Sequence, residues 1–307
     1  MIMKAFIFLL LLLLNITAGC GTAQRSASDK LLVAASFYPM AEFVRGVGGG
    51  QVEVMTMVPD GAEPHDWEPS PRDLTRLGHA RVFVYNGMVE PWAQQALEAL
   101  SERGIIPVEA GAGLFERGII PVEAGAGLFE RGSVQDPHVW ISPKRALLEV
   151  ARITDALCAA DPQHADIYKS NSRNYMARLQ ALDARLTQIG RTAPRKVFVT
   201  AHAAFGHLAA DYGLRQLSVT GISPEAEPTP ADMQRLIQTV RREGVRYIFF
   251  ETLTDPKIAA LVAQEAGVQT AVLDPLEGVD AEGRQAGLDY LKLMERNADS
   301  LAAALNE

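Results

Sequence analysis

A long amphipathic segment near the middle of the chain separates two stretches that alternate between strand-like and helix-like patterns. From Asp161 to about Arg191, apolar residues recur at steps of three and four, which is the period of one face of an α-helix. A helix of about 28 residues would span about 42 Å at 1.5 Å per residue, which is longer than a single small lobe. The segment therefore predicts a rigid helix that joins two lobes.

The two flanking stretches alternate short apolar runs, rich in β-branched residues, with helical patterns. The strand-like runs are Leu31–Ser36, Val52–Val58, Val82–Tyr85, Ile105–Val108, Lys196–Thr200, Gln216–Thr220, Tyr247–Glu251 and Thr270–Leu273. Such alternation predicts an α/β fold in which each lobe holds a roughly four-stranded parallel sheet flanked by helices. We place the first lobe at residues 31–160, the linking helix at 161–192 and the second lobe at 193–307.

Capping residues indicate where some of the helices begin. Ser70 precedes a proline, so we predict a short helix over Pro71–Leu77 with Ser70 as its N-cap. A final helix is predicted around Gln285–Leu305.

The N-terminus has the pattern of an export signal. Lys4 precedes an apolar run that ends at Leu14, which is too short to span a membrane, and small residues lead up to Cys20. This pattern is similar to a bacterial lipoprotein cleavage box. We therefore expect residues 1–19 to be a signal peptide, Cys20 to carry a lipid, and residues 20–30 to be a flexible tether. Ordinary signal-peptidase cleavage near Cys20 is the alternative.

Charge and cysteine content limit the partners. The formal net charge is −8 and no stretch is rich in Lys and Arg, so nucleic acid is not an expected partner. Apart from Cys20, the chain contains only Cys158, which lies in an apolar helical pattern, so no internal disulfide is expected. We expect a monomer on the cell envelope, held at the membrane by its lipid.

A tandem duplication lies near the end of the first stretch. Residues 102–115 and 116–129 both read ERGIIPVEAGAGLF. Two copies are too few for a repeat protein, so we expect one copy to form the fourth strand and the other to be a surface insertion. Identical residues leave open which copy is the strand.

Three histidines and one aspartate follow predicted strands. His65 lies in the proline-rich loop Glu63–Pro71 after the second strand, and His138 follows the fourth. His202 follows the first strand of the second lobe, and Asp274 follows its last. Ligands of parallel α/β sheets bind beyond the carboxyl ends of the strands, so we expect these four side chains to face one cleft.

Three imidazoles and a carboxylate suit Zn²⁺, which favours four ligands in a tetrahedron. A Mn²⁺ site would be expected to carry more oxygen ligands. Glu63 and Glu251 are acidic neighbours of these positions. Either could orient an imidazole or replace Asp274 as the fourth ligand. The other histidines, His79, His164 and His207, are not expected to bind metal.

With these residues in hand, the chain resembles the zinc- and manganese-binding substrate-binding proteins of bacterial ABC importers. The matching motifs, in the family's order, are Ser36–Pro39, Glu63–Pro71, Asp136–Pro143, His202–Gly206, Ile222–Pro228 and Leu273–Leu276. The resemblance implies two parallel-sheet lobes joined by one long helix, with His65, His138, His202 and Asp274 as metal ligands. It also implies a permease and its ATPase as partners. Manganese-binding members tend to have Glu in place of His202, so the resemblance implies zinc.

The function expected is capture of Zn²⁺ and its delivery to a membrane permease, and not enzymatic turnover. A manganese-binding homologue is the nearest alternative. A zinc hydrolase with three His ligands, and with Glu251 or Asp274 as base, is a weaker one, because the chain contains no HExxH motif. A surface adhesin has no support from individual residues. Zinc-type members often carry a His-rich loop before the second ligand, where this chain has the duplicated segment.

Overall fold

The computed structural model describes residues 30–102, 120–123, 136–222, 228–253 and 256–307. Residues 31–307 form one compact unit. The predicted signal peptide, Cys20 and the tether up to residue 29 lie outside the described residues, as does the run Ile105–Val108. Of the helices that the structure describes, none combines the length and the apolar character needed to cross a membrane.

The first sheet has four parallel strands in the order β2-β1-β3-β4. The strands are β1 (Leu31–Ala35), β2 (Val52–Thr56), β3 (Val82–Tyr85) and β4 (Ile120–Glu123). The second copy of the duplicated segment supplies β4, in which Ile120 pairs with Val82 and Glu123 with Tyr85. The structure thus answers the question that the identical copies left open.

The second sheet repeats this order, as β6-β5-β7-β8, and is also parallel throughout. Its strands are β5 (Val197–Thr200), β6 (Arg215–Ser218), β7 (Tyr247–Phe250) and β8 (Gln269–Val272). The predicted α/β fold with two four-stranded parallel sheets is confirmed. In both sheets the order reverses beside the first strand, and such reversals place binding crevices at the carboxyl ends of the strands.

Helices cover both sheets. In the first half of the chain they are α2 (Tyr38–Gly48), α3 (Pro71–Leu77), α4 (Pro91–Glu102) and α5 (Pro143–Ala160). In the second half they are α7 (Gly206–Asp211), α8 (Pro230–Glu243), α9 (Lys257–Ala266), α10 (Ala281–Gln285) and α11 (Tyr290–Asn306). The Ser70 side chain caps α3 as predicted, in a reciprocal capping box with Asp73.

The final helix predicted around Gln285–Leu305 is α11, which begins five residues later than expected, at Tyr290. The short helix α10 precedes it and ends at Gln285. Gly287 has a φ of 66°, a left-handed conformation that ends the first helix. The Asp289 side chain then accepts the backbone N–H of Lys292 and starts the second.

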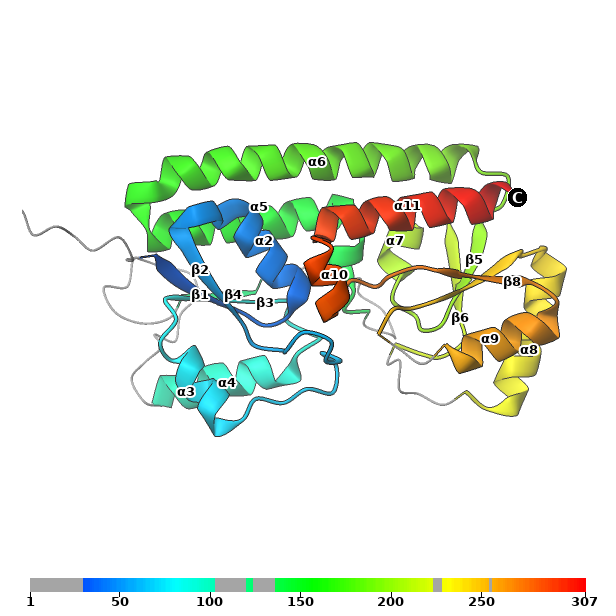
Figure 1. Ribbon diagram of the computed structural model, residues 1–307, viewed down its shortest axis with the longest axis horizontal. Helices are drawn as coiled ribbons and strands as arrows, with labels where there is room; N and C mark the ends of the chain where they lie inside the picture. Colours follow the sequence, from blue (N-terminus) through cyan, green and yellow to red (C-terminus); the bar gives the residue numbers. More distant parts are fainter. Residues whose placement is uncertain (1–29, 103–119, 124–135, 223–227, 254–255) are drawn as a thin grey trace, which may run out of the picture. The chain divides into compact units, whose positions relative to one another are not determined.

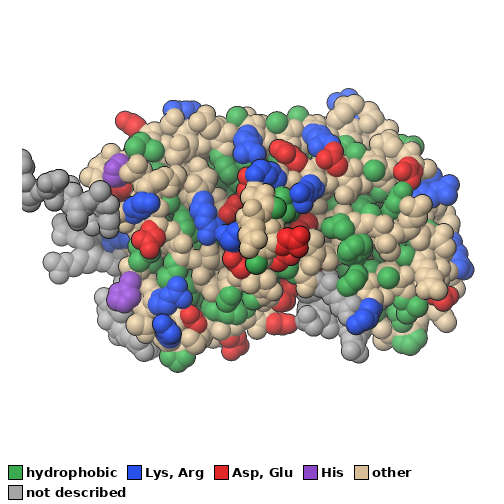
Figure 2. All heavy atoms as spheres, in the orientation of Figure 1, with side chains coloured by type: hydrophobic (Ala, Val, Ile, Leu, Met, Phe, Trp, Pro, Cys, Tyr) green, Lys and Arg blue, Asp and Glu red, His purple; other side chains and the backbone are tan. Residues whose placement is uncertain are grey.

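The long helix predicted between the lobes is α6 (Ala165–Thr192), an unbroken helix of 28 residues. It contacts α5, α2 and α11, and Figure 1 shows it running past both sheets, with α5 and α11 between it and the strands. One apolar core includes Val84 of β3, Leu186 of α6 and Phe249 of β7. The two sheets are therefore connected by packed side chains as well as by the helix. On the face seen in Figure 2, acidic and basic side chains are interspersed.

Candidate metal centre

Three imidazoles and one carboxylate converge beyond the carboxyl ends of the two sheets. His65 lies in the loop between β2 and α3, and His138 directly precedes a 3₁₀ turn at Val139–Ile141. His202 follows β5, and Glu277 lies between β8 and α10. Within the described part of the chain, these four residues form a group whose ligand atoms all lie within 4.8 Å of one another.

The spacing of these atoms matches a tetrahedral zinc site. Glu277 Oε1 lies 3.1 Å from His138 Nε2, 3.2 Å from His65 Nε2 and 3.5 Å from His202 Nε2. His138 Nε2 lies 3.2 Å from His65 Nε2 and 3.4 Å from His202 Nε2. Ligand atoms at zinc distances from a tetrahedral centre are separated by about 3.3 Å. Five of the six separations therefore suit zinc without rearrangement.

The four side chains differ in their access to water. His138 and His202 are fully buried and Glu277 is 3% exposed. The His65 side chain is 12% exposed. Prolines at 64, 69 and 71 restrict the backbone of the loop that carries His65. His65 is thus the member of the group nearest to solvent, and it lies on a stiff loop.

Carboxylates behind two of the imidazoles fix their orientation. The Nδ1–H of His202 donates to Glu251 Oε2 at 2.6 Å, and its backbone N–H donates to Glu251 Oε1 at 3.0 Å. The Nδ1–H of His138 donates to Asp136 Oδ1 at 2.7 Å. Such hydrogen bonds hold the imidazole in the tautomer that leaves Nε2 free for a metal.

Other acidic and histidine residues take supporting roles. Glu251, one of the two carboxylates considered for orientation or ligation, orients His202. Glu63, the other, accepts the backbone N–H of His65 at 3.1 Å. Asp136 was not singled out from the sequence, although its position two residues before His138 is a usable signal. His207 is buried and donates from Nε2 to the backbone oxygen of Asp136 at 2.8 Å, so it supports the loop and does not face the group.

The structure does not bring Asp274 into the group, and Glu277 takes the place expected for it. Asp274 Oδ1 accepts the backbone N–H of Leu276 at 2.7 Å, and Oδ2 accepts the Thr252 hydroxyl at 2.9 Å. The chain turns sharply at Leu276, whose φ is 56°, and the turn directs Glu277 toward the histidines. The strand-end rule pointed to the loop that contributes to this group but not to the residue within it.

Carboxylates in and behind the group favour the protonated form of two of its imidazoles, and these imidazoles favour the ionised form of Glu277. Burial alone would raise the pKa of Glu277, but hydrogen bonds from His138, His202 and His65 hold this pKa well below its usual range. Burial disfavours protonated His202, yet hydrogen bonds to Glu251 and Glu277 outweigh it and raise the pKa of His202 to about 10. The pKa of His138 is raised in the same way by Asp136 and Glu277. The site is therefore built to hold positive charge.

Comparison with known proteins agrees with this chemistry. The family model described as "Zinc-uptake complex component A periplasmic" matches residues 33–304. The chain belongs to this family, the ZnuA family. ZnuA-family proteins are uptake components, so this chain is a zinc-binding protein of an uptake system and not an enzyme.

Relatives and solved structures give the extent of the likeness. The high-affinity zinc uptake system protein ZnuA of Bacillus subtilis (strain 168) is 37% identical over 299 residues, which cover 94% of each chain. The zinc-binding protein AdcA of Streptococcus pyogenes serotype M1 is 36% identical over 315 residues, which cover 97% of this chain and 61% of AdcA. The Zn(II)-bound ZnuA-like domain of Streptococcus pneumoniae AdcA superposes with a TM-score of 0.78 at 35% identity, covering 91% of this chain and all of that domain.

Proposed function

We propose that the chain captures Zn²⁺ through His65, His138, His202 and Glu277 and delivers it to the permease of an ABC importer. The observation that carries this proposal is the near-tetrahedral spacing of three Nε2 atoms and one carboxylate oxygen. The ATPase that drives the importer would act through the permease. We propose that the protein works as a monomer, because all four ligands come from one chain.

The ligand set favours zinc over manganese. Three nitrogens and one oxygen suit a borderline-soft cation in a small tetrahedral site, whereas Mn²⁺ prefers more oxygen ligands and a higher coordination number. The carboxylates behind His138 and His202 increase the basicity of these imidazoles and so strengthen their bonds to zinc.

The same geometry opposes hydrolysis. Four protein ligands leave no open position for a reacting water, which is the mark of a closed zinc site. The two carboxylates considered as a general base are engaged elsewhere. Both oxygens of Glu251 bind His202, and both oxygens of Asp274 accept hydrogen bonds from Thr252 and Leu276.

Capture and release would depend on proton exchange and on the His65 loop. In the metal-free site, protons on His138 and His202 balance the charge of Glu277, and an arriving zinc ion displaces them. Release requires that ligands separate. Because packed side chains connect the two sheets along α6, we expect small movements of the ligand loops and not a wide rotation of lobes.

Attachment to the membrane is a second part of the proposal. We propose that residues 1–19 are removed on export and that Cys20 carries the lipid. The Cys20→Ala variant is then expected in the soluble fraction of the cell envelope, whereas the unaltered protein sediments with membranes. Sedimentation of both proteins with membranes would contradict the anchor at Cys20.

The metal proposal is tested by equilibrium titration of the metal-free protein with Zn²⁺, with and without competing Mn²⁺. We expect tight binding of one zinc per chain, strong preference over manganese, and a large loss of affinity in His138→Ala. His79→Ala is the matched control, because His79 is exposed and lies outside the group. Millimolar zinc affinity, or equal binding by His138→Ala, would contradict the proposed site.

A further inference from the structure

The segment that carries Glu277 has an unusual backbone. Residues 273–280, between β8 and α10, contain no helix or strand. Among the described residues other than glycine, Leu276 is the one with a positive φ, at 56°. A branched aliphatic residue disfavours this left-handed region because its Cβ crowds the backbone. Hydrogen bonds to this segment must therefore hold the turn that directs Glu277 to the histidines.

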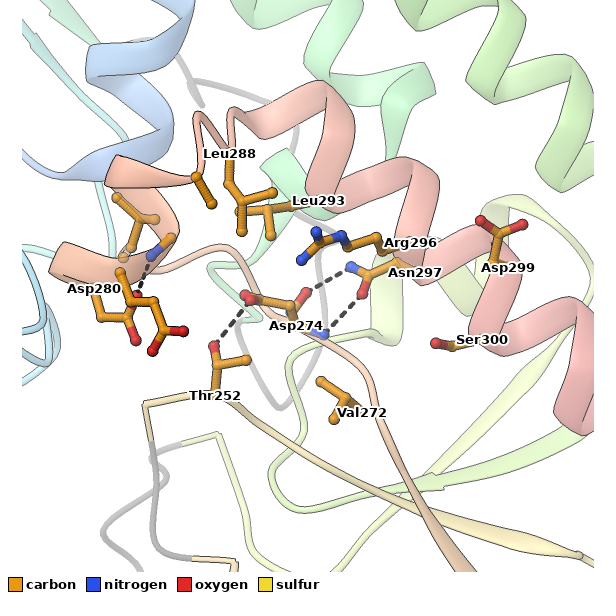
Figure 3. Close-up of a pocket in the computed structure, with 15 residues that line it drawn as sticks. Thr252, Val272, Asp274, Asp280, Leu288, Leu293, Arg296, Asn297, Asp299 and Ser300 are labelled. Carbon is orange, nitrogen blue, oxygen red and sulfur yellow. Dashed lines mark hydrogen bonds between the residues drawn. The ribbon is translucent and has the colours of Figure 1, made fainter.

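The Asp274 carboxylate supplies the nearest of these bonds. Oδ1 accepts the backbone N–H of Leu276 at 2.7 Å, which closes the turn from within. Oδ2 accepts the hydroxyl of Thr252, in the loop after β7, at 2.9 Å. Figure 3 shows Asp274 between Thr252 and Asn297 on the wall of a pocket of about 650 Å³. Both oxygens are thus used to fix the segment relative to the second sheet.

Two further side chains hold the backbone around Asp274. Asn297 of α11 is buried, accepts the backbone N–H of Asp274 at 2.8 Å and donates to its backbone oxygen at 2.6 Å. Trp140, two residues after His138, donates from Nε1 to the backbone oxygen of Pro275 at 2.8 Å. The segment is therefore hydrogen-bonded to α11 and to the loop that carries His138.

From these contacts we propose that Asp274 is a positioning residue that holds Glu277 at the metal. The inference rests on the proposed zinc site. Without the Asp274 carboxylate, Leu276 relaxes toward an ordinary backbone conformation and Glu277 moves away from the imidazoles. The site then keeps three histidines and gains an exchangeable fourth position. Asp274 thereby sets the coordination number of the bound metal without touching it.

The test compares Asp274→Ala with Asp280→Ala. Asp280 lies three residues after Glu277, as Asp274 lies three residues before it, and it caps α10 through the backbone N–H of Gly283. We expect zinc affinity to fall about 10- to 100-fold in Asp274→Ala, which is the usual effect of losing a residue that supports a ligand, and to stay unchanged in Asp280→Ala. Asp274→Asn keeps an oxygen for the Leu276 N–H, so it should restore affinity.

Cobalt provides a readout that a general loss of stability would not change. The visible absorption of the Co²⁺-loaded protein reports the coordination shell. We expect a changed spectrum in Asp274→Ala that responds further to added azide, and an unresponsive spectrum in the unaltered protein and in Asp280→Ala. If Asp274→Ala does not fold, Thr252→Val removes one bond to the same carboxylate and should show a smaller change in the same direction.

A double-variant cycle decides whether Asp274 acts through Glu277. In a Glu277→Ala background, Asp274→Ala should cause no further loss of zinc affinity, because the residue that it positions is gone. An unchanged affinity and cobalt spectrum in Asp274→Ala, or full additivity with Glu277→Ala, would overturn the positioning role. Failure of the zinc site itself would appear differently, as weak zinc binding by the unaltered protein.

Discussion

Zinc binding at pH 8 should release about one proton or more from the imidazoles of the site. A free imidazole with a pKa of about 6.5 holds about 0.03 proton at pH 8, so three such ligands would release about 0.1 in total. Here, Glu251 and Glu277 raise the pKa of His202 to about 10. His202 alone should therefore release about one proton at pH 8, with a further contribution from His138, whose pKa is also raised.

The direction and size of the pH effect follow from this count. Each proton displaced weakens the apparent zinc affinity about tenfold for every pH unit of acidification. With one proton displaced, affinity at pH 7 is about 100-fold weaker than at pH 9, or about 2.7 kcal/mol. Unperturbed imidazoles would instead give an almost constant affinity over this range.

Calorimetric titration in buffers with different ionisation enthalpies measures the proton release directly. The Glu251→Gln variant should release fewer protons at pH 8, because a neutral amide no longer stabilises protonated His202. His79→Ala, which alters an exposed histidine, should match the unaltered protein. A release near 0.1 proton at pH 8 would refute the charge coupling described for the site.

Three further predictions concern stability and the duplicated segment. The raised pKa of His202 stabilises the metal-free fold fully below pH 6.5, and this contribution is lost as pH rises toward 10, so the melting temperature of metal-free protein should fall from pH 6.5 to 9. A flat or rising profile would contradict this. Gly190→Ala places a Cβ 1.9 Å from the backbone oxygen of Tyr212, and this clash should outweigh alanine's helix propensity and lower the melting temperature by about 2–10 °C. An unchanged melting curve would show that α6 shifts freely. Deleting residues 102–115 leaves one complete copy of the repeat, and zinc affinity should be unchanged in titrations; a weaker site would show that both copies are needed.

The members of the proposed ligand set differed in how well the sequence predicted them. His65, His138 and His202 were found because each follows a strand, and the strands could be recognised from local apolar patterns. Glu277 was missed because Asp274 follows β8 more closely and has the same chemistry. The difference between the two depends on the left-handed turn at Leu276 and on Asn297, which is 23 residues from Asp274 in sequence.

The general architecture was accessible for the same local reasons. Two stretches of alternating strand and helix patterns, joined by a long amphipathic helix, predicted two parallel sheets. Each of these patterns can be recognised within a short window of sequence. The choice of the second repeat copy as β4 was not accessible, because residues 102–115 and 116–129 are identical. The break between α10 and α11 depends on Gly287, a short signal within an otherwise helical pattern.

The use of the second repeat copy for β4 has a practical consequence for protein engineering. The connection from Glu123 to His138 has the length it would have in a chain with a single copy, because the added residues precede β4. A change in chain length before β4 therefore leaves the spacing from β4 to the proposed ligands His138, His202 and Glu277 unaltered. A fluorescent reporter inserted between α4 and β4 would leave the ligand loops at their native lengths, which makes this connection a natural starting point for a zinc sensor.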